Sequence, residues 1–136
     1  MNLVEKQITP SMIMTQEALE NTVTLLSAIG GSLNALIHLP ALAAELGLTL
    51  DWDDIAKITS STPVLCGIVP NGNRTVVDLH FAGGIPAVMK ELKSVLHNDC
   101  LNVSGKSLGA ILDEAESGDR EIIHTMENSI EKADGI

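Results

Sequence analysis

The chain has 136 residues, the size of one ordinary domain with room for a single hydrophobic core. Apolar residues make up 45% of the sequence, which is typical of a globular chain and not of a disordered one. Eighteen acidic and eight basic side chains give a net charge of −10, which repels the phosphates of nucleic acids and the surfaces of anionic membranes. We therefore expect no nucleic acid and no membrane as partners.

Several features predict a cytoplasmic location. The longest apolar stretch, residues 35–48, is interrupted by polar residues and a proline, and it is shorter than the roughly 20 residues that a membrane-spanning helix needs. The first residues are polar and lack the pattern of a signal peptide. Cys66 and Cys100 lie far apart and suit reduced thiols better than a disulfide framework.

Two helices are predicted in the first third of the chain. Residues 16–29 repeat apolar side chains along one face and follow Thr15, a suitable N-cap. Residues 32–46 predict a second helix, which is apolar on most of its circumference and expected to be mostly buried, with a bend at Pro40. Its polar residues form one narrow stripe, namely Asn34, His38 and Glu45. That stripe is typical of a thin solvent-exposed edge.

Three shorter helices are predicted further along the chain. Asp51 caps the first of them, Pro86 lies in the first turn of the second, and Ser107 caps the third. Between them, residues 64–69, 75–79 and 101–103 are predicted as short strands.

These elements predict an α/β fold class, as a helix-rich layered domain with a few short strands. Beyond Gly118 the chain becomes polar, and it stops at residues 133–136 without a capping element, as a chain does when it is cut from a longer one. We expect one domain over residues 1–136.

The motifs that could carry chemistry are weak when each is considered alone. Residues 104–107 resemble the end of a phosphate-binding P-loop, but Cys100 stands where that motif needs glycine, so we reject nucleotide binding there. The four histidines and two cysteines show no metal-ligand spacing. His97 and Cys100 could pair as a base and a thiol nucleophile, although a buried structural cysteine is the simpler interpretation.

Two further patterns remain open. On the predicted strand, Asp78 and His80 would point to the same face, either as an acid–base pair or as part of a surface edge. The two glycine pairs at residues 30–31 and 83–84 could leave open amides at a helix start, where an anion can dock. Tight helix packing that only glycine permits explains the glycine pairs equally well.

Three blocks taken in order, residues 30–39 (GGSLNALIHL), 78–88 (DLHFAGGIPAV) and 96–108 (LHNDCLNVSGKSL), resemble the dihydroxy-acid and phosphogluconate dehydratase family. The connecting stretches at residues 13–21 and 63–65 resemble it as well, so the similarity covers essentially the whole chain. The resemblance identifies the chain as an internal fragment, the latter part of the family's N-terminal domain, with the boundary to a barrel-like second domain near residues 130–136.

The resemblance implies a hydro-lyase that dehydrates a 2,3-dihydroxy carboxylic acid to a 2-keto acid in valine and isoleucine biosynthesis. It also implies an iron–sulfur cluster and a magnesium ion in the parent enzyme, with cluster cysteines and magnesium ligands upstream of this chain and a serine base downstream. We therefore expect no catalytic residue, no metal ligand and no cofactor within the fragment, which should be inactive alone. The implied partners are the remainder of the parent enzyme, a dihydroxy acid substrate and further copies in a homo-oligomer.

The candidates for supporting a substrate pocket lie in the first two blocks: Ser32, Asn34, His38, Asp78 and His80. Leu33 stands where the family usually has threonine, Pro40 interrupts its helix, and residues 70–74 also differ from the common form. These departures leave a sugar-acid dehydratase as an alternative. A non-catalytic binding or assembly module is the other.

Overall fold

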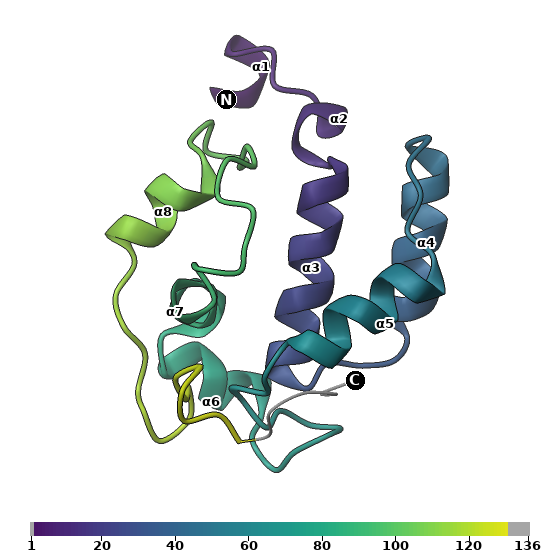
Figure 1. The fold of residues 1–136 in the computed structure, drawn as a ribbon. Helices are drawn as coiled ribbons and strands as arrows, with labels where there is room; N and C mark the ends of the chain where they lie inside the picture. The colour runs from purple at the N-terminus through teal and green to yellow at the C-terminus, as the bar shows by residue number, and fades with distance from the viewer. Residues whose placement is uncertain (1, 131–136) are drawn as a thin grey trace.

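The structure is a computed structural model that describes residues 2–130. Within those residues it contains eight helices and no regular strand, so the predicted helix-rich domain is confirmed (Figure 1). The helices are α1 (Asn2–Glu5), α2 (Pro10–Ile13), α3 (Gln16–Ile29), α4 (Ala35–Glu45), α5 (Trp52–Ser61), α6 (Val76–Phe81), α7 (Gly84–Glu91) and α8 (Leu108–Glu114). None of them is long and apolar enough to cross a membrane. The uncapped stop expected at residues 133–136 lies outside the described residues.

Helix α3 runs through the middle of the molecule, with α4 and α5 on one side and α7 on the other (Figure 1). Its bounds are those predicted, and the Thr15 hydroxyl accepts a hydrogen bond from the N–H of Ala18 at 3.3 Å, as an N-cap should. The predicted caps of α5 and α8 are also present. The Asp51 carboxylate accepts two N–H groups of α5, and the Ser107 hydroxyl accepts one of α8.

The apolar side chains form two clusters where one core was expected. The first lies between the C-terminal half of α3, the segment after α5 and helices α6 to α8, and its most deeply buried large members are Leu65, Leu92, Leu112 and Ile123. The second lies between α3 and the α4–α5 pair, and its buried members are Leu19, Val23, Ala43, Leu50 and Ile55. Helix α3 contributes buried side chains to both clusters and therefore lies between them.

The prediction that the second helix is mostly buried is wrong within the residues that the structure describes. Of the residues of α4, Ala43 is buried, whereas Ile37 is 68% exposed. Leu33, just before the helix, is 63% exposed. Helix α4 carries apolar side chains on two opposite faces. Among the described residues, α3 is the helix that packs against one of these faces. One buried face therefore accounts for its position, and the other face remains uncovered.

The predicted strands at residues 64–69 and 101–103 exist only as isolated bridges, Ile68 with Arg74 and Leu101 with Ser107. The strand predicted at residues 75–79 is wrong, because this segment forms helix α6. Thr75 and Asp78 make a capping box, in which each side chain binds the other's backbone N–H. This local pairing starts a helix in spite of the two valines, whose preference for strands suggested the opposite.

A buried asparagine ties α3 to the segment before α8. Asn21 is 5% exposed; its Oδ1 accepts the backbone N–H of His97 at 2.8 Å, and its Nδ2 donates to the His97 carbonyl at 3.0 Å. One side chain thus satisfies both backbone polar groups of a residue 76 positions away in the sequence.

Replacement of Asn21 by alanine should therefore destabilise the chain by about 1–3 kcal/mol, because the backbone N–H and carbonyl of His97 both lose the partner that the buried Asn21 side chain supplies. Urea unfolding of Asn21→Ala measures the change, and Asn128→Ala, at an exposed asparagine, is the matched control. Equal stability of the two variants would contradict the proposed tether.

Candidate functional site

The first glycine pair, Gly30 and Gly31, ends α3, and a later loop packs against it. Gly30 has φ +66°, the left-handed conformation that closes many helices, and the N–H of Gly31 returns to the Leu26 carbonyl at 2.8 Å. The loop formed by residues 66–74 lies on this turn, since Asn71 Nδ2 donates to the Gly31 carbonyl at 3.0 Å. The pair is thus used for a helix cap and for packing, which favours that interpretation over an anion site.

Ser32, Asn34 and His38 follow this turn, and all three side chains are exposed. The Ser32 hydroxyl accepts the N–H of Asn34 at 3.3 Å, which fixes the turn before α4. Asn34 occupies the N-cap position of α4 without a hydrogen bond from its side chain to the helix. Asn34 and His38 therefore present polar groups one helical turn apart on the exposed edge that the stripe predicted.

Asp78 and His80 lie on α6, so the prediction that they share one face is wrong. Two residues apart on a helix they differ by about 200° in direction. Hydrogen bonds from the backbone N–H and the hydroxyl of Thr75, at 2.7 and 2.8 Å, lower the pKa of Asp78. Its carboxylate is thus engaged as a helix cap. His80 is exposed and meets Phe81 edge to face, with ring centroids 5.4 Å apart.

Among the described residues, no hydrogen bond or ion pair joins the α4 candidates to the α6 candidates. Both groups adjoin the loop at residues 66–74. Asn71 of this loop donates to the Gly31 carbonyl before α4, and the loop ends at Thr75, the N-cap of α6. The loop therefore couples the two groups in position, without bringing their functional atoms together.

The second glycine pair is also explained by packing. A Cβ built on Gly83 would lie 2.8 Å from Ala87 Cβ and 3.2 Å from Gly118 Cα. Beside it, the N–H of Asp119 donates to the Ala82 carbonyl at 2.8 Å. This glycine pair therefore lets the segment after α8 close against the start of α7.

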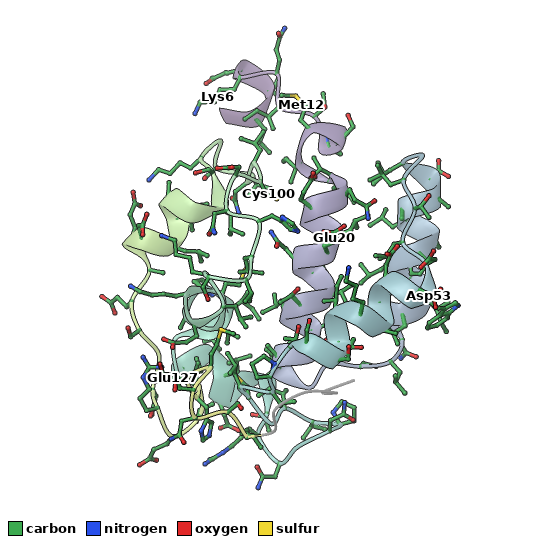
Figure 2. The ribbon with its side chains drawn as sticks, in the orientation of Figure 1. Lys6, Met12, Glu20, Asp53, Cys100 and Glu127 are labelled. Carbon is green, nitrogen blue, oxygen red and sulfur yellow. The ribbon has the colours of Figure 1, made fainter. Side chains whose placement is uncertain are left out.

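The thiols do not form a nucleophilic pair with His97. The His97 Nε2 atom pairs with Glu20 Oε2 at 2.8 Å, while the Cys100 thiol receives the Asn21 amide at 3.6 Å. Figure 2 labels Glu20, which lies on α3, and Cys100, which lies on the segment before α8. Burial raises the pKa of Cys100, and it raises the pKa of the fully buried Cys66 to about 12. A reactive thiol needs the opposite shift, so the geometry supports the structural interpretation of both cysteines.

Sequence reasoning missed two adjacent hollows beside α3 that have Cys100 and Leu101 in common. They measure about 240 and 400 Å³, and the larger is otherwise lined by Met12, Thr15, Glu17, His97, Asn98 and Asp99. Its walls come from segments at least 80 residues apart in the sequence, so neighbouring residues alone could not have revealed it as a hollow. Its carboxylates would favour a cation over a carboxylate substrate.

The remaining motifs give no site of their own. Lys106, which suggested a phosphate-binding loop, pairs through Nζ with both carboxylate oxygens of Glu114 at 2.7 and 2.9 Å. Within residues 2–130, no three histidine, cysteine, aspartate or glutamate side chains gather around a common point where a metal ion could bind.

The thiol geometry predicts slow alkylation. Because alkylation needs the thiolate, and a raised pKa lowers the thiolate fraction at every pH below it, both cysteines should react more slowly than in the urea-unfolded chain between pH 7 and 9. For Cys66 the deficit should be roughly a thousandfold from the pKa alone. Iodoacetamide labelling followed by mass spectrometry measures this. Faster labelling of Cys100 in the folded chain would revive the thiol-enzyme hypothesis.

Comparison with known proteins agrees with the resemblance. The family model "Dihydroxy-acid/6-phosphogluconate dehydratase N-terminal" matches residues 1–114. A dihydroxy-acid dehydratase from Caldicellulosiruptor saccharolyticus is 45% identical over 136 aligned residues, which cover 98% of this chain and 25% of that protein. Proteins of the same name from Lactococcus lactis subsp. cremoris and Methanosphaera stadtmanae are 45% and 40% identical, with 98% of this chain covered in each case and 24% and 25% of the relative.

The chain thus spans about a quarter of the length of the curated relatives it matches. The match to the family model extends well beyond half of the chain, and the identity to the relatives holds over nearly all of it. The chain belongs to the dihydroxy-acid/6-phosphogluconate dehydratase family and corresponds to part of its N-terminal domain.

Proposed function

We propose that this chain is a scaffold segment of a hydro-lyase that converts a 2,3-dihydroxy carboxylic acid to a 2-keto acid in branched-chain amino-acid biosynthesis. The observation that carries the proposal is the identity of 40–45% to proteins named dihydroxy-acid dehydratase along nearly the whole chain. In the reaction, C2 loses a proton and C3 loses its hydroxyl as water, and the resulting enol becomes the keto acid.

The residues of this chain do not fit the metal groups that the family implies. An iron–sulfur cluster is held by several cysteine thiolates, but this chain has two cysteines, and Cys66 is fully buried within the first core cluster. A magnesium ion needs several convergent oxygen ligands, and no such group occurs among residues 2–130. The cluster and the ion would therefore be held by parts of the parent enzyme outside this chain, and we derive no step through them here.

The contribution of this chain is to hold the exposed turn before α4 in place. Three contacts immobilise that turn: the αL cap at Gly30, the Asn71 bond to Gly31 and the Ser32 bond to Asn34. Asn34 and His38 are then presented on a rigid edge, where they can bind and orient a substrate or a neighbouring ligand. Asp78 acts differently, because its carboxylate caps α6 and holds the adjoining loop. His80 stands exposed beside it.

We also propose that the protein lies in the cytoplasm. Its proposed partner is the remainder of the parent enzyme, and the whole enzyme is proposed to form a homo-oligomer. Alone, the 136 residues should be inactive, since the proposed metal ligands are elsewhere. A sugar-acid substrate is the second candidate, because Leu33 stands where the family usually has threonine, so this chain departs from the common form in the turn itself.

A chimera tests the proposal. In it, this chain replaces the matching segment of the Caldicellulosiruptor saccharolyticus relative. We expect the chimera to form keto acid from a 2,3-dihydroxy acid faster than from a phosphorylated sugar acid, and the isolated chain to form none from either. The unmodified relative is the control. Turnover by the isolated chain would refute the scaffold role, and a preference for the sugar acid would favour the second candidate.

Asn34 is the residue in the turn whose removal should affect turnover most directly. In the chimera, Asn34→Ala should lower kcat/KM about 10- to 100-fold, the range found when a residue that orients ligands is lost. The melting temperature should stay unchanged, because the side chain is exposed and makes no cap bond. Asn73→Ala, at an exposed asparagine of the neighbouring loop, is the control. Equal kcat/KM in the two variants would remove Asn34 from the site.

A further inference from the structure

The two adjacent hollows beside α3 meet at Cys100 and Leu101, which line both of them. We call the smaller one, of about 240 Å³, the apolar hollow. Its other apolar lining residues are Ile13, Ala18, Leu25, Met89, Val103 and Leu108. We call the larger one, of about 400 Å³, the acidic hollow, because Glu17 and Asp99 line it. Together the two hollows have the volume of an ordinary small-molecule site.

The acidic hollow is negatively charged. Hydrogen bonds from its own backbone and from the Thr15 hydroxyl lower the pKa of Glu17, so its carboxylate stays ionised well below neutral pH. Burial raises the pKa of Cys100, and the charges of Glu17 and Asp99 raise it further, which places both carboxylates near the point where the hollows meet. Among the described residues, no lysine or arginine lines either hollow. A cleft lined by one sign of charge concentrates ions of the opposite sign.

The walls of both hollows are held in place by hydrogen bonds. Asn21 binds the backbone of His97 from α3, and the N–H of Leu108, at the start of α8, donates to the Cys100 carbonyl at 2.8 Å. The segment between them is therefore fixed from both sides. A preformed site loses little conformational entropy when a ligand enters it.

The lining favours a primary ammonium ion over other cations. A metal ion needs several converging ligands, and no three histidine, cysteine, aspartate or glutamate side chains converge within residues 2–130. A quaternary ammonium ion prefers aromatic walls, but neither Trp52 nor Phe81, the two aromatic residues of the chain, is among the described residues that line the hollows. A primary ammonium group donates three hydrogen bonds, for which the two carboxylates and the Thr15 hydroxyl are acceptors.

We infer that the two hollows form one binding site for an organic cation. The acidic hollow takes a primary ammonium group, and the apolar hollow takes the short aliphatic chain that this group carries. The inference goes beyond the proposed function, because it does not require that the parent be a dehydratase and it names a ligand whose charge is opposite to that of a dihydroxy acid. Its failure would therefore leave the proposed function standing.

Isothermal titration calorimetry with isopentylammonium chloride tests the inference on the 136-residue chain and on the chimera. We expect saturable binding to both proteins. Isopentanol, which has the same carbon chain without the charge, should bind about fivefold more weakly. Methylammonium, which lacks the aliphatic chain, should also bind at least about fivefold more weakly. Isovalerate, which carries a negative charge, should not bind.

The absence of saturation in either protein would overturn the inference. So would equal affinity for isopentanol or for methylammonium, because each would show that one of the two hollows does not take part. Binding of isovalerate with the affinity of the ammonium ion would also overturn it, since the two carboxylates would then not select the charge of the ligand.

Paired charge substitutions locate the ammonium group. Glu17→Gln together with Asp99→Asn should weaken isopentylammonium binding about tenfold, as the loss of two partly exposed ion pairs does. Asp53→Asn together with Glu116→Gln removes the same charge from exposed residues that line neither hollow, and it should leave the affinity unchanged. An equal loss of affinity in the two double variants would mean that the cation responds only to net charge, which would overturn the inference.

A filled apolar hollow tests the other end of the site. Ala18→Leu should weaken binding at least about fivefold by occupying the space of the aliphatic chain, whereas Ala44→Leu, at an exposed alanine of α4, should have no effect. In NMR spectra of the isotope-labelled chain, which also report whether each variant is folded, isopentylammonium should shift the amide signals of residues 15–18 and 97–101. Shifts confined to other residues would overturn the inference.

Discussion

The structure depends on one helix that is buried on two sides. Helix α3 supplies Leu19 and Val23 to one apolar cluster and Ala28 to the other, so each cluster is built against the same backbone. The hydrogen bonds that organise the rest also start from this helix. Asn21 holds the His97 peptide, Ala28 and Ile29 receive the segment after α5, and the Gly30 turn receives Asn71. Any displacement of α3 would therefore reach both the turn before α4 and the loop before α6.

This arrangement explains why the candidate residues are positioned without forming a complete site. Ser32 and Asn34 lie on the turn before α4, and His38 lies on α4 one helical turn later. Hydrogen bonds hold the turn in place, and all three side chains are exposed to solvent. Asp78 uses its carboxylate to cap the adjoining helix α6, and burial raises the pKa of both thiols, which is the opposite of what a reactive thiol needs. What these residues offer together is rigidity and an exposed polar edge. Under the function that we propose, the groups that carry out the dehydration would lie in the parent enzyme outside this chain.

The elements that could be predicted from the sequence were those with local signals. Thr15, Asp51 and Ser107 cap helices where their side chains indicated, and residues 16–29 match α3 to the residue. Helix α6 was missed because two valines outweighed the Thr75–Asp78 capping box, and the relation of Asp78 to His80 was therefore wrong as well. The burial of α4 and the hollow beside Cys100 depend on contacts between distant segments, for which a single sequence holds no signal.

The central claim is that this segment supports a metal-dependent site without supplying its ligands. The most direct test is anaerobic reconstitution of the isolated 136-residue chain with iron and sulfide, and separately with magnesium, followed by measurement of the metal bound per chain. Our account predicts no bound cluster, no visible absorbance from iron–sulfur charge transfer and no saturable magnesium binding. One iron–sulfur cluster per folded chain, held by Cys66 or Cys100, would contradict it.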